Sequence, residues 1–100
     1  MPAYLIVNTD IHEPAAYERY KAAVPALIRK HGGEYLARGG EFEVFEGSWR
    51  PCRVVLLRFP SLAAVRSFLG DPEYQPFKAI RQTAAHSDIV GVEGLDESPS

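Results

Sequence analysis

Three segments of this chain are apolar at both odd and even positions, and this pattern constrains the fold more than any other feature of the sequence. They are residues 3–9, 53–59 and 87–92. A strand with one solvated face alternates apolar and polar residues, whereas a strand buried on both faces is apolar throughout. The three segments therefore predict a sheet that is covered on both faces.

Two segments have the spacing of amphipathic helices, which is enough to cover one face of such a sheet. The first runs from Pro14, a favourable first helical residue, to about residue 31, where two glycines end it. The second begins after Ser61, a good capping residue, is interrupted at Gly70 and restarts at residues 71–73. The face without helices needs another cover, and the simplest is a second copy of the same sheet. The sequence thus predicts a homodimer.

Two further extended segments complete the element order. Residues 34–38 form a strand, two glycines break or bulge it, and residues 41–46 alternate and are expected to continue as a strand. The order strand, helix, strand, strand, helix, strand predicts an α+β, ferredoxin-like βαββαβ fold with an antiparallel sheet and both helices on one face. One such domain spans residues 1–94, and the polar residues 95–100 are predicted to form a mobile tail.

Composition excludes several classes of partner. The 100 residues suffice for one domain, and 11 basic against 13 acidic residues give a net charge of −2 without a basic cluster. Nucleic acid is therefore not an expected partner. No apolar run approaches the ~20 residues of a membrane helix. The single cysteine, Cys52, and the lack of a secretory pattern at the start predict a cytoplasmic protein.

Several short motifs, in order along the chain, resemble one protein family. They are GGEYLARGG at residues 32–40, EG at 46–47, RVVLLRFPS at 53–61, DPEYQ at 71–75, IR at 80–81 and SD at 87–88. Together they resemble domain-of-unknown-function family 1330, a branch of the dimeric α/β-barrel superfamily. The resemblance implies a dimer whose two sheets form a barrel-like interface, and it implies no reaction, since the family has no settled activity.

Three arginines are the strongest candidates for binding chemistry. Arg38 and Arg53 lie on predicted strands, and Arg81 lies on a mostly inward-facing helix. A buried guanidinium must be paired, and three that converge would hold a small carboxylate by bidentate hydrogen bonds.

The structural alternative is that carboxylates of the chain neutralise these arginines. Glu46, Glu73 and Asp88 are the candidates for such ion pairs. A further alternative is that Arg81 lies on a solvated helix face.

Aromatic residues extend the candidate site. Tyr17, Tyr20 and Tyr74 lie on helix faces turned toward the sheet, where they either pack in the core or donate hydroxyls to a ligand. Trp49 lies in a loop and could cover a pocket or pack across a dimer. The complete set of candidate ligand-binding residues is Arg38, Arg53, Arg81, Tyr17, Tyr20, Tyr74, Glu46 and Trp49.

The remaining chemistry-bearing residues indicate no cofactor and no metal. His12, His31 and His86 are scattered and lack metal-ligand spacing, and His31 is explained as a cation at a helix C-terminus. There is no nucleophile elbow, phosphate loop or dinucleotide fingerprint.

Three interpretations of function remain open. The first is a module that binds a small anionic or aromatic metabolite in a pocket between sheet and helices. The second, by superfamily analogy, is a small cofactor-poor enzyme of the monooxygenase or lyase kind. Asn8, Trp49 and His86 superficially match the Asn, Trp and His of haem-degrading relatives, but these roles are not transferred. The third is a purely structural dimer.

Overall fold

A central strand, β1 (Ala3–Ile11), organises the sheet by pairing antiparallel with a strand on each side. The computed structural model describes residues 1–95, and the strands lie in the order β2-β3-β1-β4. The other three strands are β2 (Glu34–Arg38), β3 (Val54–Phe59) and β4 (Ala85–Glu93). The predicted α+β, ferredoxin-like fold is confirmed. The predicted mobile tail at 95–100 falls, except for its first residue, outside the described residues.

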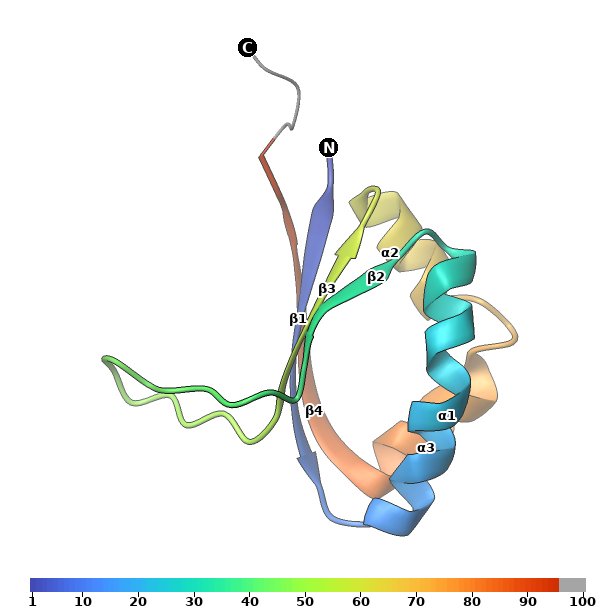
Figure 1. Cartoon of the computed structure of the whole chain (residues 1–100). Helices are drawn as coiled ribbons and strands as arrows, with labels where there is room; N and C mark the ends of the chain where they lie inside the picture. The colour runs from blue at the N-terminus through green and yellow to red at the C-terminus, as the bar shows by residue number, and fades with distance from the viewer. Residues whose placement is uncertain (96–100) are drawn as a thin grey trace.

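All three helices, α1 (Pro14–Lys30), α2 (Leu62–Leu69) and α3 (Gln75–Ala84), cover the same face of the sheet (Figure 1). Pro14 opens α1, and the Ser61 hydroxyl caps α2 by accepting the Ala64 N–H at 3.0 Å. In the described chain no helix is long and apolar enough to cross a membrane.

The predicted restart of the second helix at residues 71–73 is wrong, because these residues form a turn before α3. The Asp71 carboxylate accepts the Glu73 N–H at 2.9 Å, and the Asp71 carbonyl accepts the Tyr74 N–H at 2.9 Å. This local bonding competes with helix and postpones its start to Gln75.

The core lies between the sheet and the helices. Phe68 of α2 stands at its centre, with ring centroids 4.5 Å from Tyr74 and 5.7 Å from Phe59. Other buried members come from β1, α1 and β3: Leu5, Val24, Leu27, Ile28, Val55 and Leu57.

The opposite side of the sheet, called here the outer face, carries no helix (Figure 1). Its side chains belong to the strand residues that alternate with those of the core. Among them, Ile6 lies opposite both Leu56 and Val90. Val90 is 58% exposed and Val92 is 48% exposed. The chain's own helices thus leave an apolar sheet face open, as predicted.

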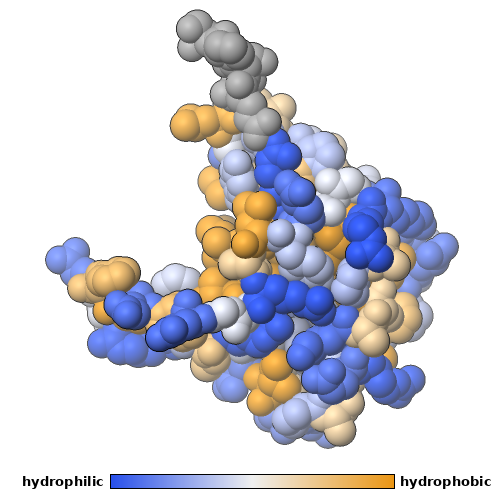
Figure 2. Space-filling model, in the orientation of Figure 1, coloured by the Kyte–Doolittle hydropathy of each residue, from blue (hydrophilic) through white to orange (hydrophobic). Residues whose placement is uncertain are grey.

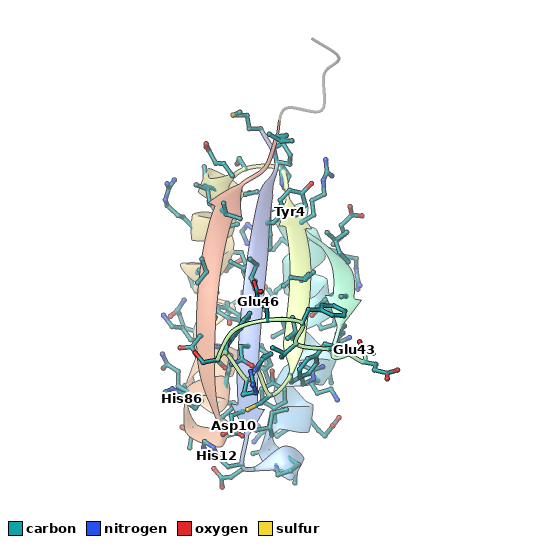
Figure 3. All side chains as sticks on the ribbon, turned by 90° about the vertical axis from the view of Figure 1, so that its left-hand side faces the viewer. Tyr4, Asp10, His12, Glu43, Glu46 and His86 are labelled. Atoms are coloured by element: carbon teal, nitrogen blue, oxygen red, sulfur yellow. The ribbon has the colours of Figure 1, made fainter. Side chains whose placement is uncertain are left out.

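Residues 39–53 form an irregular arm that projects from the outer face (Figures 1 and 3). The predicted strand at 41–46 is wrong: Gly39, with φ +70°, turns the chain away from the sheet, so within the described chain the segment has no neighbouring strand to pair with. Asn8 holds the base of the arm by accepting the Cys52 N–H at 2.8 Å. Hydrophobic side chains gather where the arm leaves the sheet (Figure 2).

Candidate functional site

A cavity of about 50 Å³ lies between the sheet and the three helices, inside the same layer as the core. A single water needs about 10–15 Å³, so the space is large enough for a small polar group. Six of the eight candidate residues line it: Tyr17, Tyr20, Arg38, Arg53, Tyr74 and Arg81. The fold therefore brings together residues from α1, β2, the arm and α3 that are distant in the sequence.

Arg81 is the buried charge of this cavity. The residue is 7% exposed, and its Nε lies 3.4 Å from the Tyr74 hydroxyl, which accepts its hydrogen bond. The interpretation of Arg81 as a residue on a solvated helix face is therefore wrong. Among residues 1–95 no carboxylate forms an ion pair with Arg81, and the predicted alternative partner Glu73 instead lies 3.6 Å from Lys30. The cost of burying this guanidinium is thus not offset by a carboxylate of the described chain.

Arg38 and Arg53 lie at the two ends of the arm, where β2 ends and β3 begins. Arg38 is exposed, stacks on the Tyr35 ring at 4.6 Å, and donates from one amino group to the Lys21 carbonyl at 3.0 Å. Arg53 is half-buried, and its carbonyl accepts the Thr9 N–H at 2.9 Å. Neither arginine forms an ion pair with a carboxylate of residues 1–95.

The tyrosines supply hydroxyls to the same space. The hydroxyls of Tyr20 and Tyr74 are 2.9 Å apart, and the rings of Tyr17 and Tyr20 lie 5.2 Å apart. Burial, together with the neighbouring Tyr74, raises the pKa of Tyr20 well above its ordinary value. The Tyr20 hydroxyl is therefore a neutral hydrogen-bonding group at physiological pH.

The lining of the cavity has one sign of charge. Lys21, Arg38, Arg53 and Arg81 are all cationic, and the lining contains no carboxylate. The remaining wall is apolar and aromatic, with residues such as Val24, Phe68 and Ile89. Such a lining is suited to a ligand that combines an acidic group with an apolar body.

Two lining residues, Lys21 and Tyr35, escaped the sequence analysis. Lys21 follows Tyr17 by four positions, so the helical period places it on the same side of α1. Tyr35 lies between the exposed residues Glu34 and Leu36, and this difference in exposure is visible only in the structure. Of the two, only the spacing of Lys21 is readable in the sequence.

Glu46 and Trp49 lie apart from the other six candidates. Both belong to the arm and line a groove with Ile6, Val54 and Leu56 on the outer face, across the sheet from the cavity. Figure 3 shows Glu46 on the arm in front of the strands, with His86 and Asp10 toward one end of the outer face. The structure thus divides the candidate set between two faces of the sheet.

A second polar cluster joins the end of α1 to the turn before α3. The Asp71 carboxylate accepts hydrogen bonds from Lys30 Nζ and lies 2.8 Å from His31 Nε2. These two contacts lower the pKa of Asp71, and the contact with Lys30 has the larger effect. In the described part of the chain no three His, Cys, Asp or Glu side chains gather as a metal site would require. The cluster is explained as a structural tie between two elements.

Comparison with solved structures supports the fold. A protein of unknown function from Rhodopseudomonas palustris aligns with 95% of this chain and 83% of its own, at 20% identity and a TM-score of 0.77. A dimeric ferredoxin-like protein of unknown function from Jannaschia sp. CCS1 aligns with 94% of this chain and 100% of its own, at 14% identity and a TM-score of 0.70.

A third similar structure belongs to a protein of stated activity. SnoaB, a cofactor-independent oxygenase from Streptomyces nogalater, aligns with 99% of this chain and 98% of its own, at 15% identity and a TM-score of 0.65. At such identities the likeness concerns the fold alone. No curated protein matches the sequence.

The sequence itself also matches a family model. The match covers residues 2–95 and belongs to the domain of unknown function DUF1330. The resemblance in the sequence motifs is thereby confirmed, and the chain belongs to the DUF1330 family.

Proposed function

We propose that this protein binds a small organic acid in the cavity between the sheet and the helices. One observation carries the proposal: Arg81 is buried, lines the cavity and has no carboxylate partner among residues 1–95. A buried and uncompensated guanidinium is costly, and an anionic ligand would offset that cost. A carboxylate is the acidic group that best fits the fork of donors on an arginine.

The rest of the lining supports an aromatic or otherwise apolar body for this acid. Tyr17, Tyr20 and Phe68 line the same cavity as Arg81 and offer ring surfaces to a ligand there. The cationic residues Lys21, Arg38 and Arg53 line the same space and would attract an anion toward it.

The proposal is tested by ligand-induced thermal shifts with benzoate and with benzamide, its neutral isostere. Benzoate should raise the melting temperature, because ligand binding to the folded state alone stabilises it, and benzamide should not. Arg81→Gln should abolish the benzoate shift, whereas Arg66→Gln, which changes an exposed arginine outside the cavity, should preserve it. Equal shifts with both compounds, or an undiminished shift in Arg81→Gln, would overturn the proposal.

We further propose that the protein is a homodimer joined through its outer faces. The open apolar face is a continuous patch and not a set of isolated exposed residues, because the strand residues Ile6 and Leu56 line one groove with apolar residues of the arm. The similar protein from Jannaschia is described as dimeric, which favours the same arrangement here.

A cofactor-poor enzyme is the second candidate function. The fold likeness to SnoaB favours it, together with a neutral Tyr20 hydroxyl that could stabilise an anionic oxygen of a bound aromatic compound. Asn8 and His86 lie on strand positions of the outer face and Trp49 lies on the arm, so these three do not line the cavity. Dioxygen consumption in an oxygen electrode with salicylate or gentisate would support catalysis, and binding without consumption would favour the binding module.

A further inference from the structure

The cationic residues of the cavity occupy two different depths. Arg81 is 7% exposed and marks what we call the floor. Arg38 is exposed, and Lys21 and Arg53 are half-buried; these three mark the mouth. All four line one cavity, so a single ligand could meet both groups.

At the floor, a chain of hydroxyls fixes the direction of one hydrogen-bond donor. Arginine only donates, so the Tyr74 oxygen accepts the hydrogen bond from Arg81 Nε. Tyr74 is completely buried, and the remaining partner of its hydroxyl in the described chain is the Tyr20 hydroxyl at 2.9 Å. Either oxygen can donate in this contact, but only donation by Tyr74 gives the buried Tyr74 proton an acceptor, so we assign the hydrogen bond in that direction. The proton of the half-buried Tyr20 is then left for a group in the cavity.

The terminal amino groups of Arg81 point to the same conclusion. Its Nε makes the only hydrogen bond of the Arg81 side chain within residues 1–95, and no fully enclosed side-chain nitrogen or oxygen of these residues lacks a partner. The amino groups therefore retain accessible surface, and the cavity is the space that Arg81 lines. The floor thus presents donors from Arg81 and Tyr20 and calls for an acceptor with negative charge, which is an oxyanion.

Two further guanidinium groups, those of Arg38 and Arg53, lie at the mouth. The Arg38 side chain is fixed by its stacking on Tyr35 and by its hydrogen bond to the Lys21 carbonyl. The Arg53 guanidinium lies against Gly39, where an added Cβ would come within 2.8 Å of Arg53 Nε. One acidic group at the floor would leave these cations without a counter-charge from the lining.

We infer that the ligand is a small organic dianion, with one oxyanion held by Arg81 and Tyr20 and the other by Arg38 and Arg53. This inference rests on the proposed function and narrows its ligand class. The cavity of about 50 Å³ takes an acidic head group, so the rest of the ligand extends toward the mouth, where the second acidic group meets its cations.

The test compares dianions with monoanions of the same shape by titration calorimetry. The probes are terephthalate and fumarate, which cover two lengths, and the monomethyl ester of each. At least one dianion should bind about tenfold or more tightly than its monoester, since a second charge-assisted contact is lost in the ester. A monoester that binds as tightly as its dianion at both lengths overturns the dianion inference and leaves the proposed function standing. Failure of all four acids to bind overturns both.

Variants of Arg53 and Arg81 test which arginine binds each acidic group of the ligand. Arg53→Gln, which leaves Arg38 in place, should lower the affinity for the preferred dianion toward that of its monoester and leave the monoester affinity unchanged. Arg81→Gln should weaken both compounds, and Arg66→Gln should weaken neither. Equal losses for dianion and monoester in Arg53→Gln would contradict the assignment of a second acidic group to the mouth. Arg53→Gln alone decides this point, so the test does not depend on whether Arg81→Gln folds.

Discussion

Gly39 lies directly against the guanidinium of Arg53, although the two residues stand at opposite ends of the arm. A Cβ on Gly39 would come within 2.8 Å of Arg53 Nε, and its φ of +70° is one that other residues adopt at a cost. Gly39→Ala should therefore destabilise the fold by about 1 kcal/mol and displace Arg53 from the mouth of the cavity. Chemical unfolding measures the first effect and terephthalate titration the second.

Gly40→Ala is the matched control for this prediction. Gly40 is adjacent and exposed, its φ is not positive, and an added Cβ would meet nothing within 4 Å. Gly40→Ala should leave both stability and terephthalate affinity close to wild type. Equal behaviour of the two variants would show that the Gly39 contact does not position Arg53.

The outer face provides a prediction about assembly. Leu56 lies at the middle of β3 opposite Ile6, so a lysine there would place a charge in the proposed interface. Light scattering should give about twice the chain mass of 11.1 kDa for the wild type and about one chain mass for Leu56→Lys. Ala63→Lys, on an exposed site of α2, should remain dimeric. A wild-type monomer at micromolar concentration would refute the proposed interface.

The predicted fold depended on signals that are local in the sequence, which explains where the prediction succeeded and where it failed. Apolar residues on both sides of β1 and β3 predict a sheet with two apolar faces, of which the chain's own helices cover one, and the structure has this arrangement (Figure 1). Residues 41–46 alternate like a strand, but a strand also needs a hydrogen-bonding neighbour, and the turn at Gly39 carries them away from the sheet.

The candidate site likewise depends partly on local sequence signals and partly on contacts between distant segments. The sequence places Arg38 and Arg53 on strands and Arg81 on a mostly inward-facing helix, but it does not show that Arg38 shares a face with Tyr35. The shift in strand register between Tyr35 and Ala37 decides that. The contact of Tyr20 with Tyr74 spans 54 residues of sequence and depends on how α1 packs beside the turn before α3. No periodicity within either segment specifies that distance.

Acid should destabilise the protein partly through Asp71. Hydrogen bonds from Lys30 and His31 lower the pKa of this carboxyl in the folded state, whereas the unfolded carboxyl keeps an ordinary pKa of about 3.9. The stabilisation is therefore complete above about pH 5 and is lost progressively as the pH falls toward the lowered folded pKa. Urea unfolding between about pH 7 and pH 3 should show this decline in the free energy of unfolding.

Asp71→Asn should be less stable than wild type at neutral pH and should show a flatter decline in acid, because the titrating group is gone. Lys30→Gln, which leaves the His31 contact at 2.8 Å, should lie between the two. Parallel pH profiles for wild type and Asp71→Asn would show that another group governs the acid sensitivity.

Tyr74→Phe tests the hydroxyl chain at the floor of the cavity. The change leaves the ring in the core but removes the oxygen that accepts from Arg81 and the proton that Tyr20 accepts. We expect a loss of about 1–3 kcal/mol in the free energy of unfolding, because the Arg81 Nε is left without its acceptor. Tyr17→Phe is the control for stability, since the Tyr17 hydroxyl makes no hydrogen bond within residues 1–95, and its effect should stay within about 0.5 kcal/mol.

Tyr74→Phe should also weaken ligand binding. The Tyr20 hydroxyl would be free to rotate in this variant, so benzoate affinity should fall even at a temperature where the variant is fully folded. Unchanged benzoate affinity in a folded Tyr74→Phe would mean that the anion is held by Arg81 without an oriented Tyr20.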